Sequence, residues 1–94
     1  MIDLFTPKEL ASKIAGACRD RRIALGLSVT TLANNAGVSR GTLHRFEKTG
    51  QVNLSNLSAI LIALRMDTQV LEAFTTRKWW SLDELQRLDR KTEK

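Results

Sequence analysis

The sequence predicts an all-α protein, and three observations support this prediction. The 94 residues include only one proline and five glycines, fewer than a turn-rich β protein needs. No segment alternates apolar and polar residues for long, as a half-buried strand does. Apolar residues instead recur at intervals of three and four, shortly after Ser, Thr or Asn residues that can cap a helix. We therefore expect a compact domain of short helices.

The first helix is expected to begin at Pro7 and to end near Leu25. Thr6 can cap its first turn, and Glu9 can complete a capping box. Gly26 is a natural end signal because it accepts the left-handed backbone that often follows a helix. Four residues at intervals of four are expected to share one face: Leu10, Ile14, Cys18 and Arg22.

Two helices of about two turns each are expected next, separated by a tight turn at Gly37. Ser28 can cap the first of them, and Ser39 can cap the second, which should end before Gly50. This arrangement of two short helices around a glycine turn is a helix-turn-helix. The inward side chains are expected to be Leu32 and Ala33 on the first helix and Leu43 and Phe46 on the second.

Three more helices are expected after Gly50. The fourth is capped by Asn53 or Ser55, and its apolar stripe comprises Leu54, Leu57, Leu61 and Leu64, widened by Ile60 and Ala63. The fifth is capped by Asp67 and carries Val70, Leu71 and Phe74. A connector leads to a last short helix, which begins with a capping box at Ser81 to Glu84 and carries Leu82, Leu85 and Leu88. We predict a domain over residues 1–74 and a connector with a C-terminal helix over 75–94.

Composition and charge exclude several classes of protein. Fifteen Lys and Arg residues against ten Asp and Glu give a net charge of +5. The single cysteine cannot form an internal disulfide, and the longest apolar run is far shorter than the roughly 20 residues of a membrane helix. No basic segment followed by an apolar stretch opens the chain, so we expect a cytoplasmic protein without a membrane partner.

Catalysis is not expected from this inventory. One His and one Cys are too few for a zinc site, and the glycines form neither a dinucleotide fingerprint nor a phosphate loop. A Cys–His nucleophile pair is formally possible from Cys18 and His44, but Cys18 lies within an apolar stripe and is expected to be an inert core residue. We predict no enzyme activity, no metal and no cofactor.

The segment from Leu27 to Glu47 resembles the XRE family of lambda-repressor-like helix-turn-helix DNA-binding proteins. The resemblance rests on Leu32-Ala33, on Ala36-Gly37-Val38-Ser39-Arg40, on Thr42-Leu43 and on Glu47 at these offsets, and it extends from about Leu10 to Phe74. It implies a five-helix lambda-repressor-like domain whose partner is double-stranded DNA. The helix from Ser39 to Glu47 would then be the recognition helix, which enters the major groove.

The resemblance assigns base or phosphate contacts to several residues. Arg40 has the planar guanidinium that suits guanine, and Gly41 permits close approach or reflects a loosely constrained position. The alternative for the charged side chains is an ordinary solvated surface, and a lone exposed His is often without a role. The implied DNA-contacting residues are Ser28, Thr30, Ser39, Arg40, Gly41, Thr42, His44 and Arg45.

Two further positions have implied structural consequences. The resemblance pairs Glu47 with Arg22 in a partly buried ion pair, so these two residues are expected to stabilise the fold rather than to bind DNA. Family members usually carry Gln after the capping Ser, where it touches the DNA backbone, but this chain has Val29. That contact must be lost or supplied by Ser28, Thr30 or the arginines at 19, 21 and 22.

The location of the charge agrees with DNA binding. Residues 1–50 hold eight Lys and Arg against four acidic residues, whereas residues 51–94 hold seven against six. The excess therefore lies on the half that carries the helix-turn-helix. Positive charge raises affinity for any polyanion without conferring sequence preference.

Members of this family usually bind near-palindromic sites as twofold dimers. Candidate dimer or partner contacts are Ile62, Trp79, Trp80, Leu82 and Leu85, because adjacent tryptophans are hard to bury in one small domain. The alternative is that this tail folds back onto its own domain. We expect a homodimeric repressor; the other possibilities are an antitoxin that binds its operator and a toxin, or an adaptor without DNA binding, for which Val29 and Gly41 are the arguments.

Overall fold

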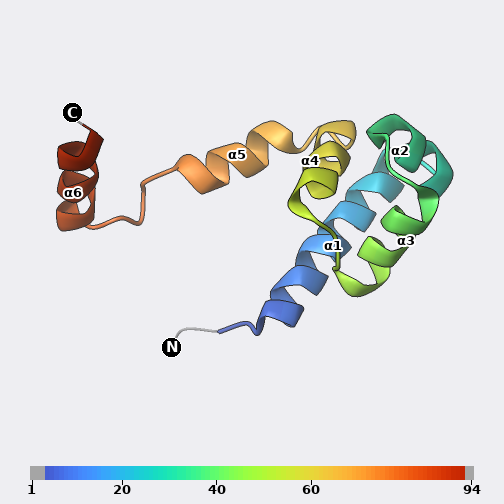
Figure 1. Cartoon of the computed structure of the whole chain (residues 1–94), viewed down its shortest axis with the longest axis horizontal. Coiled ribbons are helices and arrows are strands. Elements are labelled where there is room, and N and C mark those ends of the chain that lie inside the picture. Colours follow the sequence, from blue (N-terminus) through green and yellow to red (C-terminus); the bar gives the residue numbers. More distant parts are fainter. Residues whose placement is uncertain (1–3, 93–94) are drawn as a thin grey trace.

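The computed structural model describes residues 4–92, and every element of regular secondary structure in that range is a helix. The all-α prediction is therefore confirmed, including the separate C-terminal helix (Figure 1). The helices are α1 (Pro7–Ala24), α2 (Val29–Ala36), α3 (Arg40–Thr49), α4 (Leu54–Ala63), α5 (Asp67–Thr75) and α6 (Leu82–Thr92).

The hydrophobic core lies where the first four helices meet. α1 packs on α3, and α2 packs on both α3 and α4. The buried residues of the core are all apolar: Ala15, Cys18, Leu32, Ala33, Leu43, Phe46, Ile60, Leu61 and Leu64. The inward residues predicted for α2 and α3 are thus confirmed, because the two short helices present their apolar faces to α1 and α4.

Most of the predicted caps are present. The Thr6 Oγ1 accepts a hydrogen bond from the Glu9 N–H at 3.1 Å, and the Glu9 carboxylate accepts one from the Thr6 N–H at 2.8 Å. These hydrogen bonds hold the pKa of Glu9 below its usual value. Asn53, rather than Ser55, caps α4 by accepting from the Asn56 N–H at 2.7 Å. Local sequence determines these caps, since donor and acceptor lie three residues apart.

The predicted face of α1 is only partly correct. Ala15 and Cys18 are buried, whereas Leu10 and Ile14 are exposed. A step of four residues turns about 40° beyond one full turn, so residues at strict intervals of four wind around the helix. The N-terminal end of α1 also projects past its neighbours, where no helix covers it (Figure 1).

Two further details differ from prediction in α4 and α5. Leu54 is exposed, although it was expected in the inner stripe of α4. Asp67 does not cap α5: the N-cap position is held by Met66, which makes no side-chain capping bond, and Asp67 is the first helical residue. α5 packs on α4 and contains no buried residue, so Leu71 and Phe74 are exposed.

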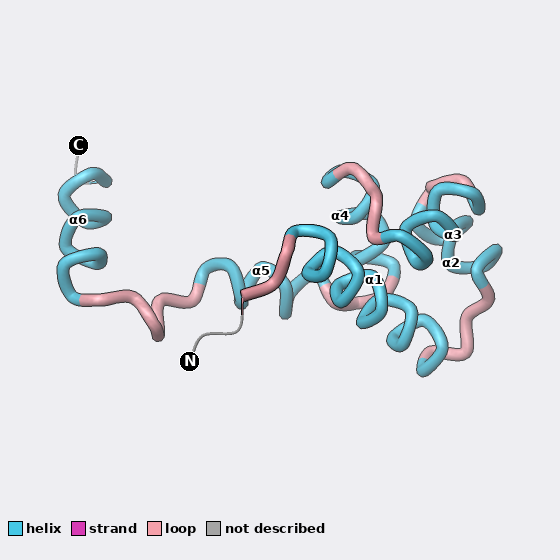
Figure 2. The backbone as a smooth tube through the Cα atoms, turned by 90° about the horizontal axis from the view of Figure 1, so that it is seen from below, coloured by secondary structure: helices cyan, strands magenta, loops and turns pink. Residues whose placement is uncertain are grey.

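α6 stands apart from the body formed by α1–α4. It takes no part in the main helix packing, and a connector after α5 carries it to the far end of the molecule (Figures 1 and 2). The radius of gyration is 16.4 Å, compared with about 12 Å for a compact domain of this length. The helix-turn-helix and the tail are therefore at opposite ends of an elongated molecule.

α1, α2 and α4 end with the same pair of backbone hydrogen bonds. A residue with left-handed backbone donates its N–H to the carbonyl three residues earlier, and the next residue donates to the carbonyl five residues earlier. The residue in the left-handed position differs among the three helices. Gly26 and Gly37 hold this position after α1 and α2, with φ of 72° and 71°, whereas Arg65 holds it after α4 with φ of 59°. A left-handed backbone costs a residue with a Cβ about 1–2 kcal/mol.

We expect Arg65→Gly to raise the free energy of unfolding by about 0.5–1 kcal/mol, because the greater freedom of glycine in the unfolded chain offsets part of the gain. Urea titration would measure it. Arg65→Ala is the control, since it removes the same side chain and retains the strained φ. Equal stability of the two variants would contradict the explanation.

Candidate nucleic-acid interface

α2 and α3 form the predicted helix-turn-helix. Gly37 adopts the left-handed conformation in the turn, and the N–H of Val38 donates back to the Ala33 carbonyl at 3.0 Å. Leu43 and Phe46 of α3 are buried against the other helices. The opposite side of α3 is consequently turned outward and held in a fixed orientation.

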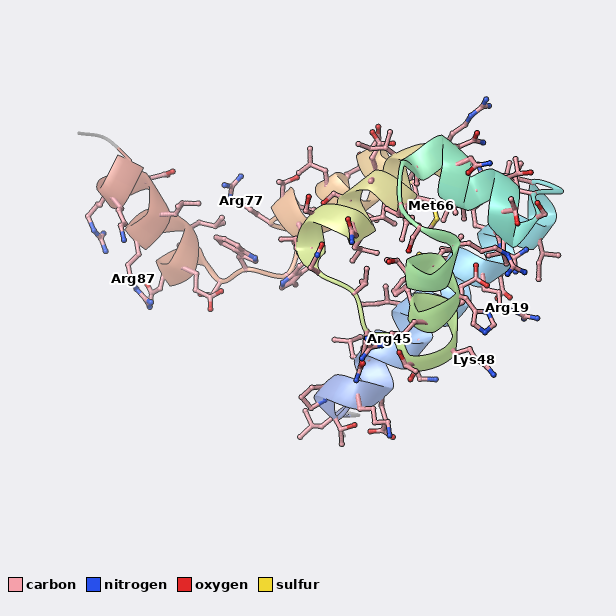
Figure 3. The ribbon with its side chains drawn as sticks, turned by 45° about the vertical axis from the view of Figure 1, so that its right-hand side comes forward. Arg19, Arg45, Lys48, Met66, Arg77 and Arg87 are labelled. Carbon is pink, nitrogen blue, oxygen red and sulfur yellow. The ribbon has the colours of Figure 1, made fainter. Side chains whose placement is uncertain are left out.

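The outward side of α3 is basic and exposed. Its exposed residues are Arg40, Gly41, His44, Arg45 and Lys48, while Thr42 is half-buried at its edge. Lys48 of α3 and Arg19 of α1 project from the body in Figure 3. This geometry places the α3 residues that the resemblance implied on one accessible surface, together with Lys48, which sequence reasoning had not selected.

The hydroxyl groups at the helix starts form paired contacts. The Ser39 Oγ accepts from the Thr42 N–H at 3.0 Å and donates to the Thr42 Oγ1 at 2.7 Å. Ser28 has the same arrangement with Thr31, at 3.0 and 2.9 Å. Because each pair uses one hydroxyl proton internally, one further hydroxyl proton in each pair is available to an anion. Thr31 was not among the predicted residues; its signal is the repeated Ser-x-x-Thr spacing.

The arginine cluster on α1 divides into structural and exposed members. Arg21 donates from Nε to the Leu64 carbonyl at 3.1 Å and so satisfies the end of α4. The Arg22 guanidinium donates two hydrogen bonds to the Glu47 carboxylate. Arg19 is exposed and is the member of this cluster best placed to reach a phosphate. Val29, which replaces the usual Gln, packs against the core and can make no polar backbone contact of that kind.

Arg22 and Glu47 form a two-point ion pair between α1 and α3. The Arg22 Nε lies 2.7 Å from Glu47 Oε2, and Nη2 lies 3.0 Å from Oε1. Nη1 also donates to the Leu27 carbonyl at 2.9 Å, so the pair ties the end of α1 to both the following loop and α3. The side chains are only 12% and 7% exposed. The hydrogen bonds that Arg22 donates to the Glu47 carboxylate raise the pKa of Arg22. This is the ion pair that the resemblance to the family implied.

A shallow polar hollow lies beside α3 and was not predicted. Its lining residues are Thr42, Arg45, Gln51, Val52, Asn53 and Asn56. The Arg45 Nη2 donates to the Gln51 Oε1 at 2.6 Å, which holds the guanidinium toward the loop between α3 and α4. No sequence signal marks Gln51, because only the fold brings it to Arg45. The hollow extends the polar surface from α3 to the start of α4.

The structure does not support a Cys18–His44 pair. Cys18 is buried in the core at 2% exposure, while His44 lies on the outward side of α3. Burial, aided by the negative charge of Glu47, raises the pKa of the Cys18 thiol to about 11, so it stays protonated and unreactive at neutral pH. Across residues 4–92, no three His, Cys, Asp or Glu side chains are grouped to hold a metal ion.

The predicted interface residues of the tail are accessible but not all together. Trp79 is 68% exposed, and Leu82 is 70% exposed. Trp80 is half-buried and has the Arg77 guanidinium 5.4 Å from its ring centre. Ile62 is also exposed, but it lies on α4 in the body, away from α6 (Figure 1). The tail does not fold back onto its own domain in this structure.

Comparison with known proteins agrees with this geometry. No curated protein matches the chain. Within residues 4–92, no helix has the length and apolar character needed to cross a membrane. A family model described as Helix-turn-helix matches residues 19–71, more than half of the chain, and this range includes all of α2, α3 and α4. The chain therefore belongs to the XRE-type, lambda-repressor-like helix-turn-helix family of DNA-binding transcription regulators.

Proposed function

We propose that this protein is a transcriptional repressor that binds a near-palindromic operator as a homodimer. The observation that carries the proposal is the exposed basic side of α3, which the Arg22–Glu47 pair and the buried Leu43 and Phe46 hold rigidly against the body. A rigid helix with an accessible polar side fits the major groove of B-DNA, which admits an α-helix.

Arg40 is the residue best suited to read a base. It is the first residue of α3, it is exposed, and its guanidinium can donate two hydrogen bonds to guanine. Arg45 and His44, one turn further, lie within reach of a base edge or a phosphate. The other implied contacts, Ser28, Thr30, Ser39 and Gly41, lie at the exposed starts of α2 and α3, where backbone N–H groups favour a phosphate.

The backbone contact normally supplied by Gln at position 29 is assigned to other groups. Donors available near the helix-turn-helix include the Thr30, Thr31 and Thr42 hydroxyls and the Arg19 guanidinium. Such phosphate contacts fix the orientation of the protein on DNA and contribute affinity that falls with salt. We propose residues 1–74 as the DNA-binding part and residues 75–94 as the dimer contact.

A homodimer is proposed because one helix-turn-helix reads few base pairs. Two copies related by a twofold axis read two half-sites about 34–36 Å apart, which gives the affinity that a repressor needs. Trp79 and Leu82, which are among the exposed large apolar side chains outside α2 and α3, support an interface in the tail. Selection of bound fragments from random DNA would test binding, sequence preference and half-site spacing together.

We expect Arg40→Ala to weaken binding to the selected operator by about five- to 150-fold, equivalent to about 1–3 kcal/mol, and to relax preference at one position in each half-site. Fluorescence anisotropy with a panel of operator variants measures both effects. Arg19→Ala is the matched comparison, because loss of a phosphate contact weakens all sequences alike and lowers the salt dependence. Unchanged affinity and preference in Arg40→Ala would reject this docking of α3.

An antitoxin is the second candidate function. The observation that favours it is the exposure of Trp79 and Leu82, because these side chains could bind a toxin as readily as a second copy of this chain. The protein encoded by the neighbouring reading frame would distinguish an antitoxin from a free-standing repressor. A toxin encoded there, which binds the full chain but not a chain with Trp79→Ala and Leu82→Ala, would support the antitoxin. A chain that selects no DNA sequence would support the adaptor.

A further inference from the structure

We propose that Gln51 is a positioning residue for Arg45. Its side-chain amide holds the Arg45 guanidinium in place for a hydrogen-bond acceptor of DNA, which is a phosphate oxygen or a guanine edge, and Thr49 fixes the place of Gln51. This inference rests on the proposed DNA binding and goes beyond it, because the resemblance to the family assigns no contact with DNA to Thr49 or Gln51.

Three hydrogen bonds join Arg45, Thr49 and Gln51 in a closed ring at the end of α3. The Thr49 Oγ1 donates to the Arg45 carbonyl at 2.7 Å and accepts from the Gln51 N–H at 3.1 Å. The Arg45 Nη2 donates to the Gln51 Oε1 at 2.6 Å and so closes the ring. Gly50, with its left-handed backbone, makes the turn between Thr49 and Gln51. Both the backbone and the side chain of Gln51 are therefore held relative to Arg45.

The ring holds Arg45 on the side of α3 that faces the start of α4. Arg45 lies five positions after Arg40, so the two side chains leave α3 about 140° apart. Thr42 leaves α3 about 60° from Arg45, and both residues line the polar hollow beside α4. Arg45 thus lies next to the loop that joins α3 to α4 (Figure 3). Arg40 and Arg45 are consequently suited to different acceptors on the DNA.

An amide holds an arginine without neutralising it, and this distinguishes Arg45 from Arg22. Arg22 is paired with the carboxylate of Glu47, which neutralises the guanidinium between α1 and α3. Gln51 carries no charge, so Arg45 keeps its positive charge on the exposed side of α3. Gln51 uses one hydrogen of the Arg45 Nη2, which leaves the other N–H donors for a phosphate or a base.

Holding Arg45 before DNA binds should increase affinity. An arginine side chain loses much conformational entropy when it is fixed, and a side chain that is already held loses less of it on binding. The hydrogen bond to Gln51 has a charged donor, and such bonds are stronger than those between neutral groups. We therefore expect Gln51 to act on DNA binding through Arg45 and not through a contact of its own.

A double-mutant cycle on the full chain measures this dependence. The probe is the DNA duplex selected from random sequences, and fluorescence anisotropy gives the dissociation constant. Gln51→Ala should raise that constant by about three- to tenfold. In a chain that already carries Arg45→Ala, the same substitution should change it by less than about twofold. Equal changes in the two chains, or no change in either, would overturn the proposal.

Thr49 offers a matched pair of variants. Thr49→Val removes the hydroxyl from which both of its hydrogen bonds are made, so it should weaken DNA binding by more than about twofold. Thr49→Ser retains the hydroxyl and should bind as the unmodified chain does. Urea unfolding of both variants checks that they are folded under the conditions of the binding experiment. If Val and Ser at position 49 gave equal affinity for DNA, the ring would not position Arg45.

Gln51→Glu separates the holding of the guanidinium from the freedom of its charge. A carboxylate accepts the same hydrogen bond but neutralises Arg45, so DNA binding should fall at least as far as in Gln51→Ala and should depend less on salt. Binding as tight as that of the unmodified chain would overturn the argument from charge and the proposal with it.

The order of the Arg45 side chain can be measured without DNA. Nuclear magnetic resonance relaxation of the Arg45 Nε–H reports motion of the guanidinium on the fast timescale. The order parameter should fall in Gln51→Ala and be retained in Gln51→Glu, while that of Arg40 should be the same in all three chains. An Arg45 that is as mobile in the unmodified chain as in Gln51→Ala would overturn the proposal.

Arg45→Ala alone identifies the acceptor. Loss of a phosphate contact weakens binding to all sequences alike and lowers the salt dependence, whereas loss of a guanine contact relaxes preference at one position. Failure of this inference is distinguishable from failure of the proposed function. A chain that selects DNA but shows no coupling between Arg45 and Gln51 would overturn the positioning and leave the repressor intact. A chain that selects no DNA would overturn both, whatever the order of Arg45.

Discussion

Glu47→Ala is expected to lower the free energy of unfolding by about 3–5 kcal/mol, a large share of the stability of a domain this small. The substitution removes the carboxylate that receives two hydrogen bonds from Arg22, at 2.7 and 3.0 Å. The guanidinium is almost fully covered and cannot regain water without opening the contact between α1 and α3. It is therefore left as a largely covered charge with only the Leu27 carbonyl as acceptor.

Thermal unfolding followed by circular dichroism would measure this loss, which corresponds to a fall in melting temperature of more than about ten degrees. The matched control is the double variant Arg22→Met and Glu47→Leu, which removes both charges and keeps apolar volume. We expect it to recover most of the stability, because the main cost of the single variant is the unpaired charge. A single variant that loses less than 1 kcal/mol would contradict this account of the partly buried pair.

Local interactions explain why much of this fold could be predicted from the sequence. The caps at Thr6, Ser28, Ser39 and Asn53 each join atoms three residues apart, and the turn at Gly37 depends on one backbone conformation. Short-range patterns of this kind are written directly in the sequence. They were sufficient to place all six helices and to identify the helix-turn-helix.

Contacts between distant segments could not be predicted in the same way. The hydrogen bond from Arg21 to the Leu64 carbonyl spans 43 residues, and nothing in the sequence distinguishes Arg21 from its exposed neighbour Arg19. The same holds for Gln51, which the fold brings to Arg45. Which side of an apolar helix is covered also depends on its neighbours, so Leu10 was expected on the apolar face although it is exposed.

The proposed DNA-contacting residues were identified in two different ways. Their position on α3 follows from the alternation of buried Leu43 and Phe46 with exposed neighbours, so the outward side could be deduced from periodicity. The proposal that a particular exposed residue contacts a base depended on the resemblance to the family.

Gly50→Ala is expected to lower the free energy of unfolding by about 2–5 kcal/mol for two separate reasons. Gly50 ends α3 with φ of 78°, a conformation that costs a residue with a Cβ about 1–2 kcal/mol. It also lies against α1: a Cβ placed on Gly50 would be 2.8 Å from the Ala11 carbonyl carbon and 2.9 Å from its oxygen. Backbone atoms cannot swing aside as a flexible side chain can, so α1 and α3 would have to separate, at a further cost of about 1–3 kcal/mol.

Gly26→Ala separates these two reasons. Gly26 has nearly the same positive φ, 72°, but a Cβ there meets no atom within 4 Å. Urea unfolding should therefore show a loss of about 1–2 kcal/mol for Gly26→Ala and a clearly larger loss for Gly50→Ala. The difference between the two losses measures the close approach of α1 to the end of α3, on which the orientation of the outward side of α3 depends. Equal losses of stability would mean that α1 and α3 can separate at this point without a free-energy cost. The orientation of α3 would then be fixed by the Arg22–Glu47 pair and the hydrophobic core alone.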